Sequence, residues 1–232
     1  MRGIDHSDPA FVAARRAKNS RRVALIRRLV REHAGMDLQG KRVLEYGCHL
    51  GFAVSALTAD NALCLGLDVD KQVLGAAAGR KEAVFFSAAG PGLPFADQSF
   101  DFVFSSEVIE HVPPTHWRGY IAEFHRVLAP RGVGYISYPN FWFPIEQHHF
   151  IPFYHWLPRG LRKQAMFEAI PRTRALQRLL ARWFILTDIS NRFLDSPYAR
   201  SLHAPWLYRL VRLLARTPCT PHTYLLLRKR HG

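Results

Sequence analysis

Two glycines and an acid follow predicted strands at a spacing that suits a nucleotide-type cofactor. The segment Val43-Leu-Glu-Tyr-Gly-Cys-His-Leu-Gly51 reads as a buried strand that runs into a turn, and a helix is predicted from Phe52. Glycine lets a backbone turn sharply and lets a ligand lie against it. Asp68 ends the next predicted strand, where a carboxylate can accept two hydrogen bonds from a ribose diol. The pattern therefore predicts a site for a ribose-bearing cofactor.

Glu45 helps to choose between the two cofactor types that use such a turn, dinucleotides and S-adenosylmethionine. A dinucleotide places a pyrophosphate dianion at the turn and favours a bare helix N-terminus. Glu45 lies two residues before Gly47, where its carboxylate would repel pyrophosphate but attract the ammonium and sulfonium of S-adenosylmethionine. The G-x-G-x-x-G spacing of dinucleotide sites is also absent, since Gly47 and Gly51 are four residues apart with His49 between them. The charge pattern favours S-adenosylmethionine.

Histidines that follow two later strands could assist methyl transfer. A hydroxyl acceptor benefits from a general base, and histidine suits this role near neutral pH. His111 follows the fourth predicted strand, and the histidine- and aromatic-rich segment 146–156 follows the fifth. We expect this segment to form a lid over an apolar or ring-bearing acceptor, with His148 or His149 as the base. A packed lid whose histidines only bond to the backbone is the alternative.

A metal site in the same segment is disfavoured. Its candidate ligands are Glu146, His148, His149 and His155. Adjacent histidines rarely point to one side of the chain, and no second acid is in view. We therefore predict no metal.

Strands and helices alternate along much of the chain. Apolar runs of strand length lie at 42–47, 62–67, 84–87, 100–104, 133–137, 183–188 and 223–227. Amphipathic stretches predict one or two helices at 9–34 and further helices at 52–60, 72–78, 117–128, 161–170, 174–182 and 206–216, and a turn is predicted at 130–132. This alternation predicts an α/β fold with a doubly wound, mostly parallel sheet, which binds ligands at the carboxyl ends of its strands.

We expect a single domain with four parts. N-terminal helices occupy 1–40, a cofactor-binding core 41–140, a substrate lid or helical cap 141–182, and closing strands with an inserted basic helix 183–232.

Four stretches resemble the class I S-adenosylmethionine-dependent methyltransferases, and the bacterial small-molecule branch with the ubiquinone-biosynthesis-type enzymes is the most similar. VLEYGCHLG (43–51) resembles the first motif of that family and GLDVD (66–70) its second-strand end. LPFADQSFDFVFSSEVIEHVPP (93–114) resembles the fourth-strand region, and HRVLAPRGVGYISYPN (125–140) resembles the fifth-strand motif.

The resemblance implies a Rossmann-like sheet of seven strands with an antiparallel last strand, and S-adenosyl-L-methionine as the cofactor. It implies that Asp68 binds the ribose and that Ser105, Ser106 and Glu107 line the methionine end of the cofactor. Ala89 stands where the family has an acid that contacts the adenine amino group. The predicted cofactor-binding residues are Glu45, Gly47, Cys48, His49, Gly51, Asp68, Val69, Ala88, Ala89, Ser105, Ser106 and Glu107.

Composition limits the class of protein. The chain has 232 residues, of which 48% are hydrophobic and 22% charged, so it can bury a core. Cys48, Cys64 and Cys219 are odd in number and widely spaced, which fits no disulfide framework or zinc knuckle and favours a reducing compartment. No apolar run approaches the roughly 20 residues that a membrane span needs. The first residues lack the apolar region of a secretory signal, so we expect a cytoplasmic protein.

Charge is unevenly distributed and leaves other functions open. The net charge of +14 divides into +7 for residues 1–42, −5 for 43–150 and +12 for 151–232. Basic flanks attract nucleic acid, anionic lipid or a phosphorylated substrate, so peripheral membrane association is a possibility. The sequence Ser-Ser-Glu-Val that starts at Ser105 lacks the Asn/Asp-Pro-Pro-aromatic signature of base-amine methylation, which disfavours a nucleic-acid (RNA) methyltransferase.

Three functions therefore remain in view. The favoured one is a methyltransferase for a small-molecule, sugar or lipid-linked acceptor, with O-methylation preferred. The alternatives are the RNA methyltransferase and a non-catalytic partner subunit with this fold. His49 and Ala89, which depart from the family pattern, motivate the non-catalytic alternative.

Overall fold

The computed structural model divides into two compact units. It describes residues 9–59, 62–71, 74, 84–87, 92–145, 152–157, 172–195, 209, 213 and 220–230. The first unit contains Met1–Phe104 and Arg126–Val133, and the second contains Ser105–His125 and Gly134–Gly232. Strands β4 (Phe100–Ser106) and β5 (Leu128–Pro139) each contribute residues to both units.

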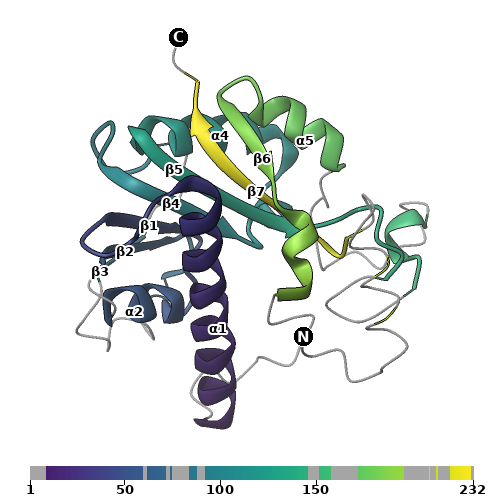
Figure 1. Ribbon diagram of the computed structural model, residues 1–232, viewed down its shortest axis with the longest axis horizontal. Helices are drawn as coiled ribbons and strands as arrows, with labels where there is room; N and C mark the ends of the chain where they lie inside the picture. Colours follow the sequence, from purple (N-terminus) through teal and green to yellow (C-terminus); the bar gives the residue numbers. More distant parts are fainter. Residues whose placement is uncertain are drawn as a thin grey trace. The chain divides into compact units, whose positions relative to one another are not determined.

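Parallel strands form the sheet of the first unit (Figure 1). Its elements are α1 (Pro9–Ala34), β1 (Arg42–Tyr46), α2 (Phe52–Ala59), β2 (Leu63–Asp68), β3 (Val84–Ser87) and the first part of β4. The strands follow one another in the order β3, β2, β1, β4, and every neighbouring pair is parallel. Tyr46 lies opposite Leu67 in the register. The turn after β1 and the end of β2 at Asp68 therefore lie side by side at the carboxyl edge of the strands.

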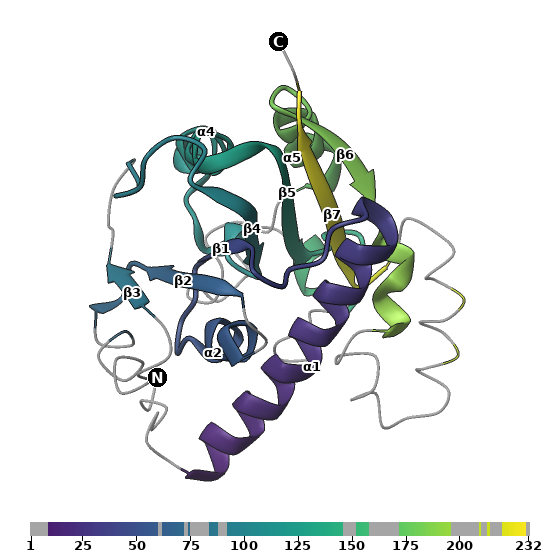
Figure 2. The same ribbon diagram turned by 60° about the vertical axis from the view of Figure 1, so that its left-hand side comes forward.

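Helix α1 packs its apolar face inside the first unit. Its buried residues are Val23, Leu25, Ile26, Leu29 and Val30. The helix contacts α2 (Figure 2). Nearer its N-terminus, Phe11 and Val12 pack against the buried Leu50 and Phe52. The amphipathic stretch predicted at 9–34 is thus one helix, because spacings of three and four residues bring its apolar side chains to one face.

The second unit brings the end of β5 beside the start of β7. Its elements are α4 (Trp117–Val127) as far as His125, β5 from Gly134, α5 (Thr173–Leu180), β6 (Phe184–Asp188), β7 (His222–Lys229) and the 3₁₀ turns Ile109–His111, Pro114–His116, Tyr154–Trp156 and Ser190–Asp195. Strands follow in the order β5, β7, β6, and β6 and β7 are antiparallel. The Asn140 backbone N–H donates to the Pro221 carbonyl at 2.9 Å. The first residues of β7 therefore lie at the edge where β5 ends.

The predicted α/β fold, with a mostly parallel sheet and an antiparallel strand at its end, is confirmed. The turn predicted at 130–132 is wrong, because β5 already begins at Leu128. A Cβ at Gly132 would lie 2.9 Å from the Asp101 carbonyl oxygen, so glycine serves close packing there. The helices predicted at 72–78, 161–170 and 206–216 lie almost entirely outside the described residues. Among the described residues, no helix has the length and apolar composition of a membrane span.

Gly134 of β5 is a second position where we expect an added methyl group to destabilise the fold. A Cβ there would lie 2.7 Å from Phe124 of α4 and 3.0 Å from Leu227 of β7. Overpacking of this kind costs about 2 kcal/mol. We expect Gly134→Ala to lower the free energy of unfolding by about that amount in urea titrations followed by circular dichroism.

Gly119→Ala is the matched control for Gly134→Ala. Gly119 lies in α4, and a Cβ there meets nothing within 4 Å. Alanine favours a helix over glycine, so this variant is expected to gain about 0.5–1 kcal/mol. Equal stability of the two variants would contradict the packing at Gly134.

Candidate functional site

The turn after β1 has the backbone conformation that the glycine pattern predicts. Gly47 and Gly51 have φ angles of 86° and 66°, in the left-handed region that glycine tolerates best. The backbone N–H groups of Gly47 and Cys48 both donate to the Leu67 carbonyl of β2, at 2.7 and 3.0 Å. His49 is also left-handed, with φ 47°, which few residues other than glycine adopt. The turn is therefore fastened to the end of β2.

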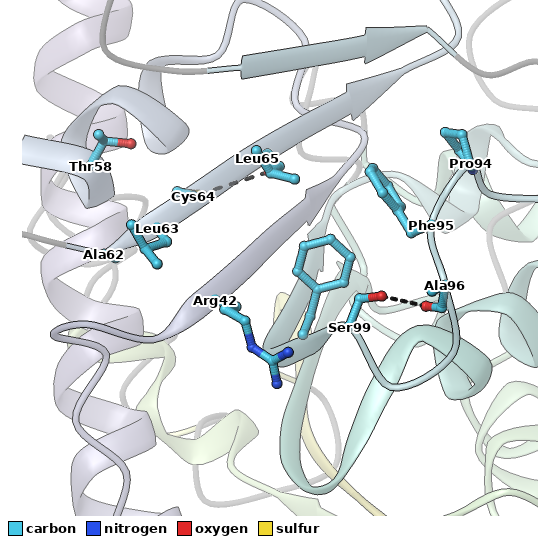
Figure 3. A pocket seen from close by; sticks show the side chains of 11 residues that line it. Arg42, Thr58, Ala62, Leu63, Cys64, Leu65, Pro94, Phe95, Ala96 and Ser99 are labelled. Carbon is cyan, nitrogen blue, oxygen red and sulfur yellow. Dashed lines mark hydrogen bonds between the residues drawn. The ribbon is translucent and has the colours of Figure 1, made fainter.

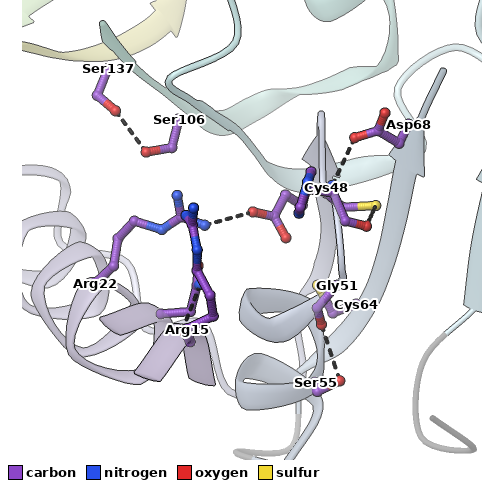
Figure 4. A network of polar contacts seen from close by, with 12 residues as sticks. Arg15, Arg22, Cys48, Gly51, Ser55, Cys64, Asp68, Ser106 and Ser137 are labelled. Atoms are coloured by element: carbon purple, nitrogen blue, oxygen red, sulfur yellow. Dashed lines mark hydrogen bonds and ion pairs between the residues drawn. The ribbon is translucent and has the colours of Figure 1, made fainter. Parts of the chain in front are cut away.

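Asp68 holds this turn from the neighbouring strand. Its Oδ2 accepts the His49 backbone N–H at 2.7 Å, and its Oδ1 accepts that of Asp70 at 3.1 Å (Figure 4). The adjoining Val69 is 64% exposed. A carboxylate has about four lone-pair positions, so each oxygen of Asp68 can accept one more hydrogen bond. This capacity suits the two hydroxyls of a ribose.

Glu45 is buried below the turn, and its partner is a residue that sequence reasoning missed. The side chain is 1% exposed, and its Oε1 lies 3.1 Å from Nη2 of Arg22 in α1 (Figure 4). Burial raises the pKa of Glu45 to about 7, with Arg22 lowering it and Asp68 raising it further. The helical period carries a signal for Arg22, which shares a face with Ile26 and Leu29 at spacings of four and three residues.

The other oxygen of Glu45 provides the test of whether a cofactor fits. Among the described residues, Oε2 has no hydrogen-bond partner of normal geometry, although the Val54 backbone N–H is close enough to the carboxyl group to lower its pKa slightly. A buried carboxylate oxygen without a partner is costly, and an ammonium group is the chemistry that would satisfy it. Glu45 and Asp68 thus fit the amino group and the ribose of S-adenosylmethionine, both from the first unit.

The two cysteine thiols near this turn are expected to be unreactive. Cys48 and Cys64 are buried free cysteines. Burial, with the charge of Glu45, raises the pKa of each thiol well above its usual value. The thiolate is the reactive form of cysteine, so neither side chain is suited to act as a nucleophile.

Three residues at the end of β4 are held by polar contacts inside the second unit. The Tyr120 hydroxyl donates to Ser105 Oγ at 2.5 Å, and the Oγ atoms of Ser106 and Ser137 are 2.8 Å apart (Figure 4). Glu107 has a left-handed φ of 59°, and its Oε1 lies 3.4 Å from Nε2 of His222. Sequence reasoning missed His222, because it began the last strand one residue later.

The acid and histidine that follow Glu107 differ in environment. Glu110 is fully buried, and neither carboxyl oxygen has a hydrogen-bond partner among the described residues. Burial, with the charge of Glu107, raises the pKa of Glu110 well above the usual range. His111 is exposed in the 3₁₀ turn after β4. Its predicted catalytic role stays a prediction.

Four predicted site residues lie outside the described part of the chain: Ala88, Ala89, His148 and His149. Among the residues that are described, no three histidine, cysteine or acidic side chains gather into a metal-binding group. The lid and its proposed base therefore stay predictions.

A cavity of about 530 Å³ opens at the opposite edge of the first unit's sheet. Its lining includes Arg42, Leu63 and Phe100, the first residues of β1, β2 and β4 (Figure 3). Arg42 is held there by Asp101, with Nη2 and Oδ1 2.9 Å apart. Ligands of doubly wound sheets bind at the carboxyl ends of the strands, so this cavity is separate from the candidate cofactor site.

Comparison with known proteins identifies the central part of the chain. Residues 44–136 match the methyltransferase domain family. The matched stretch includes the turn after β1, Asp68 and the end of β4. An "Uncharacterized methyltransferase" of Mycolicibacterium paratuberculosis is 33% identical over 148 residues, which cover 62% of this chain and 56% of that protein. The chain spans about half the length of the curated relatives that it matches.

Solved methyltransferase structures share the fold. An S-adenosylmethionine-dependent methyltransferase from Mesorhizobium loti has a TM-score of 0.60 at 19% identity, over 83% of this chain and 92% of that one. A TehB-like SAM-dependent methyltransferase from Corynebacterium glutamicum has a TM-score of 0.57 at 14% identity, over 91% and 88%. These similarities show that this chain has the fold of the solved S-adenosylmethionine-dependent methyltransferases.

Proposed function

We propose that this protein transfers a methyl group from S-adenosylmethionine to the oxygen of a small-molecule, sugar or lipid-linked acceptor. The observation that carries the proposal is the pairing of Asp68 with the glycine turn, above a buried Glu45 that has an unsatisfied oxygen. A turn without these two acids would have no carboxylate to bind the ammonium group of the cofactor. The bacterial small-molecule branch, with the ubiquinone-type enzymes, is the proposed family relationship.

The residues of this chain have separate tasks in the proposed reaction. Asp68 orients the ribose while keeping the turn fastened, and Glu45 attracts the ammonium group at the other end of the cofactor. Arg22 helps to keep Glu45 ionised, because its guanidinium lowers the pKa that burial raises. The bound cofactor supplies an already activated methyl group, so the protein mainly orients the reactants and excludes water.

The acceptor side of the proposal rests on sequence patterns and family resemblance. We propose that Ser105, Ser106 and Glu107 border the methionine end of the cofactor, and that the segment 146–156 covers the acceptor with His148 or His149 as a base. The +12 charge of residues 151–232 supports an anionic acceptor or one presented at an anionic membrane surface.

Binding of S-adenosylhomocysteine at several pH values tests the cofactor site. An ammonium group beside Glu45 favours the ionised carboxylate, so the pKa of Glu45 falls on binding from its value of about 7. Binding therefore releases a proton below pH 7, and we expect affinity by isothermal titration calorimetry to be about 10-fold higher at pH 8 than at pH 6. Glu45→Gln is expected to bind about 10-fold more weakly at pH 8 and to lose the pH dependence.

Methylthioadenosine, which lacks the amino-acid end of the cofactor, is the control ligand. Its affinity is expected to be the same for Glu45→Gln and the unmodified protein at both pH values. Equal weakening of both ligands would place Glu45 away from the ammonium group. Absence of S-adenosylhomocysteine binding at millimolar concentration would refute the proposed function as a whole.

A further inference from the structure

Three strands of the second unit bring a carboxylate and a histidine together where β4 and β5 end and β7 begins. The Glu107 backbone N–H donates to the Ser137 carbonyl at 2.9 Å, which ties the end of β4 to β5. The Asn140 side-chain amide donates to the Thr220 carbonyl at 2.8 Å, which ties the end of β5 to the segment before β7. Within this frame Oε1 of Glu107 lies 3.4 Å from Nε2 of His222, and the two residues are here called the Glu107–His222 pair.

His222 is fixed in place and shielded from solutes. Its side chain is 1% exposed, and its ring stacks on Tyr224 with centroids 6.0 Å apart and planes 5° apart. Tyr224 in turn stacks on Tyr135 of β5. The Thr220 hydroxyl donates to the His222 carbonyl at 2.9 Å, which anchors the backbone. His222 can therefore orient a neighbour but cannot itself contact a substrate.

Glu107 is the accessible member of the pair. Its side chain is 18% exposed, against 1% for His222. It adopts a left-handed backbone conformation, which is strained for a residue with a side chain and occurs often at functional sites. The neighbouring Glu110 is fully buried, and its burial together with the charge of Glu107 raises the pKa of Glu110 well above the usual range. The Glu107 carboxyl group, in contrast, reaches solvent at the carboxyl edge of β4, beside the His222 ring.

We propose that Glu107 is the catalytic residue that accepts the proton of the acceptor hydroxyl, and that His222 positions it. The inference rests on the proposed function, which puts the residues after β4 beside the reactive end of the cofactor. In the step, the acceptor oxygen forms a bond to the methyl carbon while its proton passes to the Glu107 carboxylate. The carbon–sulfur bond breaks, its electron pair returns to sulfur, and the proton later leaves to water.

Sinefungin tests this placement without knowledge of the acceptor. In this analogue a protonated amine takes the place of the transferred methyl group, whereas S-adenosylhomocysteine has nothing there. A carboxylate at the point of transfer binds the amine through a charge-assisted hydrogen bond, so we expect Glu107→Gln to weaken sinefungin binding about 10-fold in isothermal titration calorimetry. Because Glu107 also borders the methionine end of the cofactor, affinity for S-adenosylhomocysteine is expected to fall too, but by less than about threefold, so the preference for sinefungin is the quantity that Glu107→Gln lowers.

His222 variants separate positioning from general support of the fold. His222→Phe keeps an aromatic ring but cannot donate to Glu107, so it is expected to lose part of the preference for sinefungin over S-adenosylhomocysteine. His222→Gln can still donate and is expected to recover it. Glu123→Gln, on α4 in the same unit, is the matched control and is expected to change neither affinity.

If Glu107→Gln keeps the same preference for sinefungin over S-adenosylhomocysteine, the inference is overturned. If His222→Phe and His222→Gln lose the same amount of affinity for both ligands, the positioning role of His222 is overturned. Should Glu107→Gln fail to fold, Glu107→Asp gives the same comparison, since the shorter carboxylate moves the charge away from the amine. Failure of the unmodified protein to bind either ligand would refute the proposed function instead.

Discussion

Replacing Asp68 with asparagine is expected to weaken binding of S-adenosylhomocysteine about 100-fold, because two charge-assisted hydrogen bonds of about 1.5 kcal/mol each are lost or reversed. Both oxygens of Asp68 already accept backbone N–H groups, from His49 and Asp70. An asparagine has one acceptor oxygen, so its amide nitrogen would face one of these N–H groups. The substitution therefore removes the contact to ribose and loosens the turn at the same time.

Isothermal titration calorimetry measures the effect, and two comparisons define it. Methylthioadenosine keeps the ribose, so Asp68→Asn is expected to weaken both ligands by a similar factor, unlike Glu45→Gln. Asp70→Asn removes the same charge two residues further on and is expected to cost less than about threefold. Similar losses in Asp68→Asn and Asp70→Asn would point to a general charge effect and would contradict a ribose contact.

Local sequence patterns predicted the glycine turn after β1 and the place of Asp68 at the end of β2. The left-handed turn at Gly47 and Gly51 follows from the conformational freedom of glycine, which is a property of single residues. The position of Asp68 follows from the end of an apolar strand, and the parallel register brings that end beside the turn. Both features depend on neighbours in the chain and on the geometry of a parallel sheet, so they are accessible without a structure.

Charged pairs between distant segments were not predicted. Arg22 lies on helix α1 and Glu45 on strand β1. Glu107 directly follows β4 and His222 begins β7, at opposite ends of the second unit's sequence. The sequence contains 32 lysines and arginines and 18 acidic residues, and attraction between opposite charges does not indicate which of them pair. The pairs are determined only by the folded structure. Only the helical spacing of Arg22 with Ile26 and Leu29 carries a local signal that it turns inward.

The burial of Glu45 also predicts an unusual dependence of stability on pH. The pKa of Glu45 is about 7 in the folded protein against 4.5 for an unperturbed glutamate. Between these values the folded state holds a proton that the unfolded state releases, so the contribution of Glu45 to stability falls as the pH rises from 4.5 to 7. The difference of 2.5 pKa units corresponds to about 3 kcal/mol.

Glu45→Gln removes this titration while keeping a polar group that can accept a hydrogen bond from Arg22. We expect the free energy of unfolding of the variant, relative to the unmodified protein, to rise by about 3 kcal/mol between pH 4.5 and pH 8. Urea titrations at the two pH values measure it. Glu32→Gln is the matched control, because Glu32 is 45% exposed beside Arg28 and is expected to shift the same difference by only a few tenths of a kcal/mol.

A rise in Glu45→Gln no larger than that in Glu32→Gln would mean that Glu45 is ionised at little cost, and that its second oxygen is already satisfied. In that case the reason to place an ammonium group beside it would disappear. A rise of the expected size, together with pH-dependent binding of S-adenosylhomocysteine, would show that the folded protein holds a destabilising buried charge that a cationic ligand relieves. A buried charge that lowers the stability of the free protein is typical of a ligand-binding site, because the ligand later satisfies the charge. A residue with only a structural role would gain nothing from it.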